Sequence, residues 1–297
     1  MTTEKMTAQI GAGQGFIAAL DQSGGSTPKA LKLYGVEADA WSDEAGMFDL
    51  VHAMRARIIK SPAFSGQKVI GAILFEQTMD RDIDGIPTAT YLWEKRGVVP
   101  FLKIDKGLDA EVNGCQVMKA MPELDALLEK AVRAGIYGTK ERSVISAANE
   151  DGIKAVVDQQ FAIAKQVSSH GLMPIVEPEV TISIADKAAA ETILRREILA
   201  HLDALPKGTQ VMLKLTIPSE ANFYAPLVDH PAVLKLVALS GGYSRDEANA
   251  LLAKNRGMIA SFSRALSEGL KAQQSEGEFD ATLKSAVDSI HAASVAG

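Results

Sequence analysis

The sequence contains only one cysteine, Cys115, so it cannot form a disulfide bond within the chain. A lone cysteine most often packs as a small buried side chain. The five histidines are dispersed singly, and neither they nor the cysteine show the paired spacing of zinc sites. We therefore expect no catalytic metal held by the protein and no cofactor.

Long apolar runs and an excess of positive charge are also missing. No apolar run approaches the roughly 18 uncharged residues of a membrane-spanning helix, and the first ten residues lack the apolar core of a signal peptide. The net charge is −6, whereas nucleic-acid-binding domains usually carry a basic surface. We expect a cytoplasmic protein that binds neither membranes nor nucleic acids. The oligomeric state stays open, and a homo-oligomer is compatible with the sequence.

Aromatic residues make up only 5% of the chain, but 47% hydrophobic and 23% charged residues are typical of a globular protein with a sizeable core. No Pro-rich or Ser-rich linker and no low-complexity tract divides the 297 residues. Barrels of alternating strands and helices commonly contain roughly 250 residues in one domain. We therefore expect residues 1–297 to form a single domain.

Eight short runs rich in Val, Ile and Leu alternate with segments of helical periodicity, which indicates βα units around a parallel sheet. The predicted strands are residues 16–21, 69–75, 101–105, 137–142, 173–180, 211–217, 234–239 and 258–262. Helices are predicted at residues 122–134, 151–169 and 186–205, with Gly135 and Gly171 as left-handed caps, and a long loop at residues 77–97. Eight strands favour an α/β fold, a single (β/α)8 TIM barrel.

Charged residues interrupt or end these strands, although strands buried on both faces should be almost entirely apolar. The charged residues are Asp21, Lys103, Asp105, Lys140, Arg142, Glu177, Glu179, Lys214 and, just past the last strand, Arg264. Any one of them fits a structural ion pair or a solvated strand end as well as a function. As a set they cluster near the carboxyl ends of six strands, where barrel enzymes place catalytic groups. We interpret the set as an active site.

This predicted site has more positive than negative groups, which indicates an anionic ligand. Ser240, Gly241 and Gly242 follow the seventh strand, and their backbone N–H groups can approach an anion closely. Arg264 follows the eighth strand and can supply a planar fork of donors. Barrels often bind phosphate between these two loops. A Ser-Gly-Gly turn alone is more often just a turn, so the prediction depends on its position.

Lys214 lies in the middle of the sixth strand among apolar neighbours, which disfavour its charged form. A second cation nearby, for which Lys140 is the candidate, would favour Schiff-base formation further. The alternative is a lysine whose ammonium group reaches out of the barrel wall into solvent. Glu177 is the candidate proton shuttle. Glu179 lies on the same face, and their like charges together with partial burial would raise the pKa of one of the two carboxyls. Glu179 itself is interpreted as the partner of a neighbouring lysine.

Six motifs occur in order along the chain. They are Ala-Ala-Leu-Asp-Gln-Ser-Gly-Gly-Ser at residues 18–26, Ile-Leu-Phe-Glu-Gln-Thr at 73–78, Lys-Ile-Asp-Lys-Gly at 103–107, Pro-Ile-Val-Glu-Pro-Glu at 174–179, Leu-Lys at 213–214 and Leu-Ser-Gly-Gly at 239–242. Together they are specific, although any one alone is weak. Over nearly the whole chain the sequence resembles the class I fructose-bisphosphate aldolases, and it is most similar to their shorter bacterial branch.

The resemblance implies reversible cleavage of the C3–C4 bond of fructose 1,6-bisphosphate through a lysine Schiff base, in glycolysis and gluconeogenesis. The products would be dihydroxyacetone phosphate and glyceraldehyde 3-phosphate. It implies that Lys214 forms the imine, that Glu177 is the general acid and base, and that Lys140 is the neighbouring cation. Asp21 would assist at the carbon–carbon bond. The implied substrate-binding residues are Ser23, Lys103, Arg142, Ser240, Gly241, Gly242, Ser261 and Arg264.

Some positions depart from the animal pattern. Gln22 stands where animal aldolases have glutamate, Leu-Thr follows Lys214 in place of Pro-Asn, and residues 261–264 read Ser-Phe-Ser-Arg in place of Ser-Tyr-Gly-Arg. The sequence given also lacks the terminal tyrosine tail. These departures leave the preference between fructose 1,6-bisphosphate and fructose 1-phosphate open. Two alternatives remain: a lysine-dependent barrel aldolase for a smaller sugar phosphate, and a non-catalytic sugar-phosphate binder or scaffold.

Overall fold

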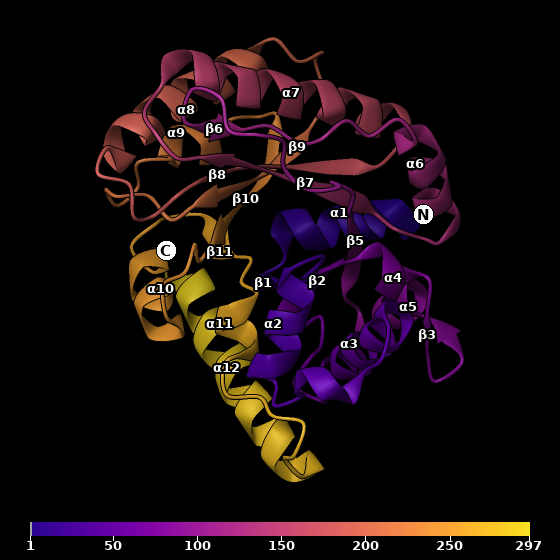
Figure 1. The fold of residues 1–297 in the computed structure, drawn as a ribbon. Coiled ribbons are helices and arrows are strands. Elements are labelled where there is room, and N and C mark those ends of the chain that lie inside the picture. The colour runs from indigo at the N-terminus through magenta and orange to yellow at the C-terminus, as the bar shows by residue number, and fades with distance from the viewer. Residues whose placement is uncertain (1) are drawn as a thin grey trace.

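Eight parallel strands, with helices between them, form a nearly closed barrel in the computed structural model, which describes residues 2–297 (Figure 1). In the order of the sheet they are β1 (Phe16–Leu20), β2 (Val69–Leu74), β5 (Val99–Lys103), β7 (Gly138–Ile145), β8 (Met173–Val180), β9 (Val211–Thr216), β10 (Val233–Leu239) and β11 (Met258–Ala260). The backbone N–H of Ala19 donates to the carbonyl oxygen of Phe262 at 3.1 Å, which joins the first strand to the end of the last. The predicted barrel is confirmed.

Helices surround the barrel and close one of its ends. They are α1 (Thr2–Ala12), α2 (Ser26–Leu33), the 3-10 helix η1 (Ala38–Ala40), α3 (Glu44–Lys60), α6 (Leu124–Arg133), α7 (Glu150–Ser169), α8 (Lys187–Asp203), α9 (Ala225–Val228), α10 (Arg245–Leu252), α11 (Arg264–Ser267) and α12 (Glu276–Ala296). The three predicted helices correspond to α6, α7 and α8. Gly135 and Gly171 follow α6 and α7 with φ angles of 80° and 77°, as expected of left-handed caps. Within the described residues, no helix is long and apolar enough to cross a membrane.

The prediction of a long loop at residues 77–97 is wrong. The segment holds α4 (Glu76–Met79), a hairpin of β3 (Asp82–Ile83) and β4 (Ile86–Pro87), α5 (Thr88–Thr90) and the π-helix η2 (Tyr91–Arg96). Asp84 and Gly85 both have positive φ, which is the backbone that a two-residue hairpin turn requires. These elements are too short to show a hydrophobic period. The sequence therefore indicated only the turn at Asp84 and Gly85.

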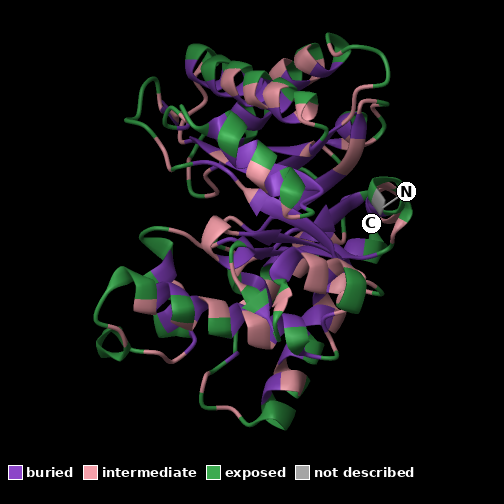
Figure 2. Cartoon of the chain, turned by 90° about the vertical axis from the view of Figure 1, so that its right-hand side faces the viewer, coloured by how far each residue is buried: buried purple, intermediate pink, exposed green. Residues whose placement is uncertain are grey.

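Side chains alternate along each strand, and this alternation divides the core into two parts. Figure 2 shows that the strands are largely buried, whereas exposed residues lie mainly on the helices and loops. Outward-facing apolar side chains pack against the helices. Inside the barrel, a second apolar cluster includes Ile73, Phe101, Ile175 and Met212. Helix α1 closes this cluster, because Ile10 packs into it. The apolar filling leaves the carboxyl ends of the strands for polar side chains.

Cys115 lies in β6 (Cys115–Gln116), a short strand that pairs antiparallel with β7 beside the barrel path. Its side chain is buried, as expected of an unpaired cysteine. Burial raises the pKa of the Cys115 thiol to about 11, so the thiol stays protonated at neutral pH.

Candidate active site

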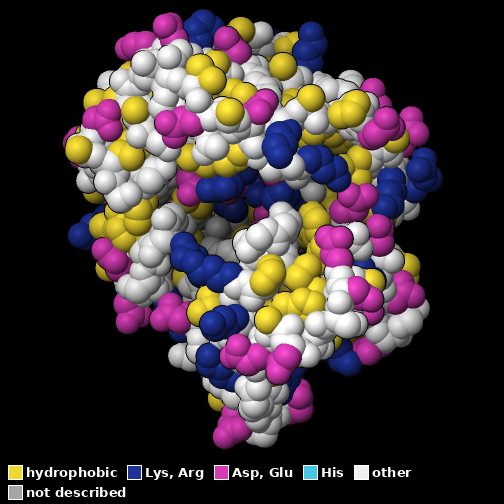
Figure 3. Space-filling view, viewed as in Figure 1, with side chains coloured by type: hydrophobic (Ala, Val, Ile, Leu, Met, Phe, Trp, Pro, Cys, Tyr) yellow, Lys and Arg dark blue, Asp and Glu magenta, His cyan; other side chains and the backbone are white. Residues whose placement is uncertain are grey.

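A cavity of about 640 Å³ opens at the carboxyl ends of the strands. Figure 3 shows a hollow in this face of the molecule, with Lys and Arg side chains along its walls. The sequence-predicted residues that line the cavity are Asp21, Ser23, Lys103, Lys140, Arg142, Glu177, Lys214, Ser240, Gly241, Ser261 and Arg264. Gly242 lies outside this lining, although a Cβ at its position would be 3.4 Å from the Arg264 guanidinium.

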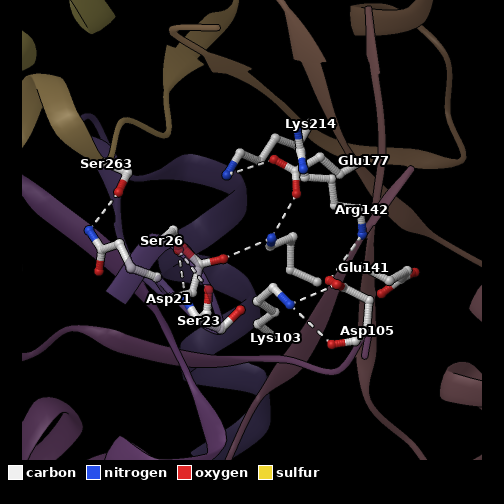
Figure 4. A network of polar contacts seen from close by, with 12 residues as sticks. Asp21, Ser23, Ser26, Lys103, Asp105, Glu141, Arg142, Glu177, Lys214 and Ser263 are labelled. Carbon is white, nitrogen blue, oxygen red and sulfur yellow. Dashed lines mark hydrogen bonds and ion pairs between the residues drawn. The ribbon is translucent and has the colours of Figure 1, made fainter. Parts of the chain in front are cut away.

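The centre of the cavity is a chain of four buried charged side chains (Figure 4). Lys214 Nζ lies 2.9 Å from Glu177 Oε1, and Lys140 Nζ lies 2.8 Å from Glu177 Oε2. Lys140 Nζ also contacts Asp21 Oδ2 at 2.7 Å. Glu177 therefore joins the two lysines, and Lys140 joins the two carboxylates. This arrangement places Lys214 inside the barrel mouth, contrary to the alternative of a lysine that reaches into solvent.

Strand register explains why these residues meet. Lys140 in β7 pairs with Lys103 in β5, and Arg142 in β7 pairs with Glu177 in β8. Residues two apart on a strand share a face, so Lys140 and Arg142 both point into the cavity. Lys214 in β9 projects toward the same space.

The buried ion pair of Asp21 and Lys140 stabilises both groups in their ionised forms. Burial opposes ionisation of Asp21, but the ammonium groups of Lys140 and Lys214 outweigh it and hold the pKa of Asp21 well below its usual range. Burial likewise opposes the charge on Lys140, but Asp21 and Glu177 raise the pKa of Lys140 above its ordinary value. Asp21 is therefore a carboxylate and Lys140 an ammonium ion across the neutral pH range.

A second group of charges lies beside the first. Lys103 Nζ contacts Asp105 Oδ1 at 2.7 Å, and Asp105 Oδ2 accepts the backbone N–H of Arg142 at 3.3 Å. Arg142 Nε contacts Glu179 Oε2 at 2.5 Å. Glu179 thus balances a cation as expected, but the prediction of a lysine partner is wrong. The register places Glu179 opposite Val144 and within reach of the longer arginine side chain.

The anion-binding end of the cavity is formed by the loops after β10 and β11. Gly241 and Gly242 have φ angles of 59° and 120°, and a Cβ at Gly241 would lie only 2.6 Å from the side chain of Ile182. Both positions therefore require glycine. Arg264 is exposed at the rim, and no carboxylate among residues 2–297 forms an ion pair with it. A free guanidinium beside a glycine turn suits a phosphate group.

Polar residues in the cavity wall, and one behind it, were missed from the sequence. Ser26 and Lys29 of α2 line the cavity near Ser23, and Lys29 also has no ion-pair partner in the described chain. The sequence signal for Lys29 was its position about one helical turn after the motif at residues 18–26. Within the described residues, no cluster of His, Cys, Asp or Glu has the composition and geometry of a candidate metal site.

The other missed residue is Arg55 of α3, which is completely buried. Its guanidinium donates to the backbone carbonyl oxygen of Gln22 at 2.6 Å and to Thr78 Oγ1 at 2.7 Å. Gln22 in turn donates to Ser263 Oγ at 2.7 Å, which links the loop after β1 to the loop after β11. Burial lowers the pKa of Arg55 to about 10. An arginine on the apolar face of a helix, next to Met54, was the signal in the sequence.

Comparison with known proteins agrees with this geometry. Residues 2–218 match the family model described as "Fructose-bisphosphate aldolase class-I". Proteins called "Fructose-bisphosphate aldolase class 1" from Porphyromonas gingivalis and Synechocystis are 58% and 56% identical to the chain over 281 residues. Each alignment covers 95% of this chain, together with 95% of the first relative and 94% of the second.

The fold has a solved counterpart. A fructose-bisphosphate aldolase from Plasmodium falciparum superposes with a TM-score of 0.81 at 20% identity, over 99% of this chain and 95% of that one. At this identity the likeness concerns the fold, which is the same barrel. The family model and the two relatives decide the classification: the chain belongs to the class I fructose-bisphosphate aldolase family.

Proposed function

We propose that this chain cleaves fructose 1,6-bisphosphate reversibly into dihydroxyacetone phosphate and glyceraldehyde 3-phosphate through a Schiff base on Lys214. The observation that carries the proposal is the buried chain of contacts from Lys214 through Glu177 to Lys140 and Asp21. It brings an amine, a carboxylate that touches two lysines and a second carboxylate together at the barrel mouth. Membership of the aldolase family supports the same chemistry.

In the first half of the proposed reaction, the neutral amine of Lys214 attacks the C2 carbonyl carbon of the substrate. Glu177 moves one proton from the nitrogen to the oxygen, which gives the neutral carbinolamine. A second proton, taken up from solvent and delivered by Glu177, then lets the hydroxyl group leave as water. The product is a protonated imine. The contact of Glu177 Oε1 with Lys214 Nζ supports this assignment, because the carboxylate lies beside the atom that must exchange the proton.

In the second half, the C3–C4 bond breaks and its electron pair moves into the imine. Asp21 accepts the proton of the C4 hydroxyl group, and glyceraldehyde 3-phosphate leaves. The enamine is then protonated at C3, and water hydrolyses the imine to release dihydroxyacetone phosphate and free Lys214. Asp21 is suited to this position because it is ionised and held by Lys140.

The substrate phosphates account for the remaining predicted residues. We assign one phosphate to the turn of Ser240, Gly241 and Gly242 together with Arg264 and Ser23. The unpaired cation of Lys29 is added to this group from its place in the cavity lining. Lys103 and Arg142 are assigned to the substrate hydroxyls and the second phosphate, with Ser261 at the cavity floor.

The setting of the proposed reaction follows from the same family. We place the protein in the cytoplasm, in glycolysis or gluconeogenesis, and we assign it no metal. The whole chain is proposed to act as one catalytic domain, since the cavity takes residues from both the first and the last strand regions.

A cleavage assay on the purified protein tests the proposal. Fructose 1,6-bisphosphate should yield the two triose phosphates, and the rate should be the same with and without EDTA. Faster cleavage of a sugar monophosphate than of the bisphosphate would favour an aldolase of different substrate range. Binding of the bisphosphate without any cleavage would contradict the proposal and favour a sugar-phosphate binder.

A further inference from the structure

One polar residue of α7 touches the strands that carry the proposed proton shuttle and its cation. Gln160 is completely buried and lies on the helix face that is otherwise apolar. Its Nε2 donates to Ser143 Oγ at 2.8 Å and to the backbone carbonyl oxygen of Glu141 at 3.1 Å. Its Oε1 accepts the backbone N–H of Glu177 at 3.3 Å. A single side-chain amide therefore links β7 to β8.

Gln160 joins the two strands at a point where β8 pairs with only one of its two neighbouring strands. Strand β8 pairs with β7 along its whole length, but its pairing with β9 ends at Val176 opposite Leu213. Glu177 is the next residue, and its backbone N–H is the group that Gln160 accepts. On this side of the strand Glu177 pairs with Arg142 of β7, and the amide of Gln160 adds a side-chain contact to the same backbone N–H.

Small movements of this backbone matter, because the Glu177 carboxylate is held between the side-chain nitrogens of two lysines. It lies 2.8 Å from Lys140 Nζ and 2.9 Å from Lys214 Nζ. A displacement on the order of 1 Å at a catalytic group can reduce a rate about 100-fold.

We propose that Gln160 is a positioning residue that fixes the backbone of Glu177, and with it the shuttle carboxylate, relative to Lys140 and Lys214. It touches no substrate and acts only through β7 and β8. The inference rests on the proposed aldolase function. It goes further because it assigns a role in the reaction to a residue of helix α7, which packs on the outer side of the barrel strands.

The neighbouring residue offers a matched control. Gln159 accepts the backbone N–H of Met118 at 2.8 Å and donates to the carbonyl oxygen of Met118 at 2.9 Å. Met118 does not line the cavity. Gln159→Met and Gln160→Met each remove a side-chain amide that binds backbone groups. The backbone held by Gln159 is that of Met118, outside the proposed site, whereas Gln160 binds the backbone of Glu177, inside it.

Both variants should lose thermal stability, since each frees buried or partly buried backbone groups. Only Gln160→Met should lower kcat, by about 10- to 100-fold with KM changed less than about threefold, and shift the limbs of the pH profile of kcat. Gln160→Asn keeps a polar amide but is one methylene shorter and cannot reach both strands. It should show the same kcat loss, and it decides the question if Gln160→Met does not fold.

Equal kcat values and superimposable pH profiles for the folded Gln159 and Gln160 variants would overturn the positioning role. A Gln160 variant that changes KM and leaves kcat unaltered would overturn it as well. If the unmodified protein does not cleave fructose 1,6-bisphosphate, the proposed function fails first, and this inference fails with it. The two failures are thus distinguished by the wild-type rate.

Discussion

At the scale of single residues, Glu177 has the central position in the cavity because its two carboxylate oxygens contact different lysines. Glu179, two residues further along β8, contacts Arg142 and neither of these lysines. The sequence placed both glutamates on one face but could not tell their partners apart. The distinction depends on the register of β7 and β8 and on the length of each cation, which only the folded barrel determines.

The two glutamates therefore form a matched pair for mutation. Glu177→Gln keeps the shape of the side chain but cannot exchange a proton, so kcat should fall by roughly 100-fold or more while the fold is retained. Glu179→Gln should leave kcat within about tenfold of the wild type, since Glu179 only balances Arg142. Steady-state cleavage assays measure both. A larger loss in Glu179→Gln than in Glu177→Gln would reverse the assignment.

The environment of Glu141 differs from that of its neighbours Lys140 and Arg142, which line the cavity. Its side chain points away from the cavity and is completely buried, and its carboxyl group accepts a hydrogen bond from Thr139 at 3.3 Å. Burial, with a contribution from nearby Asp105, raises the pKa of Glu141 well above its ordinary value of 4.5. The folded protein therefore binds a proton at Glu141 more tightly than the unfolded chain does.

This difference predicts a pH-dependent effect on stability. Folding takes up a proton at Glu141, so the free energy of unfolding contributed by this residue decreases as the pH rises from about 4.5 toward the raised pKa, by about 1.4 kcal/mol per pH unit. Glu141→Gln cannot ionise and escapes this loss. The variant should therefore gain stability relative to the wild type as the pH rises from about 5, as measured by urea denaturation. Parallel pH profiles for the two proteins would contradict the prediction.

At the scale of elements, the eight strands could be predicted because parallel strands are buried on both faces and appear as short apolar runs. The charged residues within those runs revealed the carboxyl-end cavity. The hairpin and short helices at residues 77–97 could not be predicted, since each has fewer residues than a hydrophobic period needs. The contacts of Arg55 and Gln160 could not be predicted for another reason. Each is a polar residue on an apolar helix face, and its partner lies far away in the sequence.

The loops after β10 and β11 are the elements assigned to phosphate. Arg264 follows β11 and has no ion-pair partner in the described chain, so its charge is available to a substrate. Arg264→Ala should raise KM for fructose 1,6-bisphosphate by roughly tenfold or more, because a charge-assisted contact is lost. Arg256 is exposed and paired with Asp229, so Arg256→Ala is the control and should leave KM unchanged. Equal KM values for both variants would remove Arg264 from the phosphate site.

At the scale of the whole molecule, the barrel separates an apolar end from a charged one. Helix α1 closes the apolar interior, and the charges of six strand regions meet at the opposite end. The chain has a net charge of −6, yet its cavity collects unpaired cations at the rim. The proposed bisphosphate substrate is compatible with an acidic protein, because the local arrangement of charge decides what the cavity attracts.

The central claim is that the substrate forms an imine with Lys214, and chemical trapping tests it most directly. Borohydride added together with dihydroxyacetone phosphate should inactivate the protein irreversibly, and peptide mass analysis should locate the reduced adduct on Lys214 alone. Lys214→Met, which is similar in length and cannot form an imine, should fold and give neither adduct nor cleavage. An adduct on Lys103 or Lys140, or cleavage activity that borohydride leaves intact and EDTA abolishes, would contradict the account.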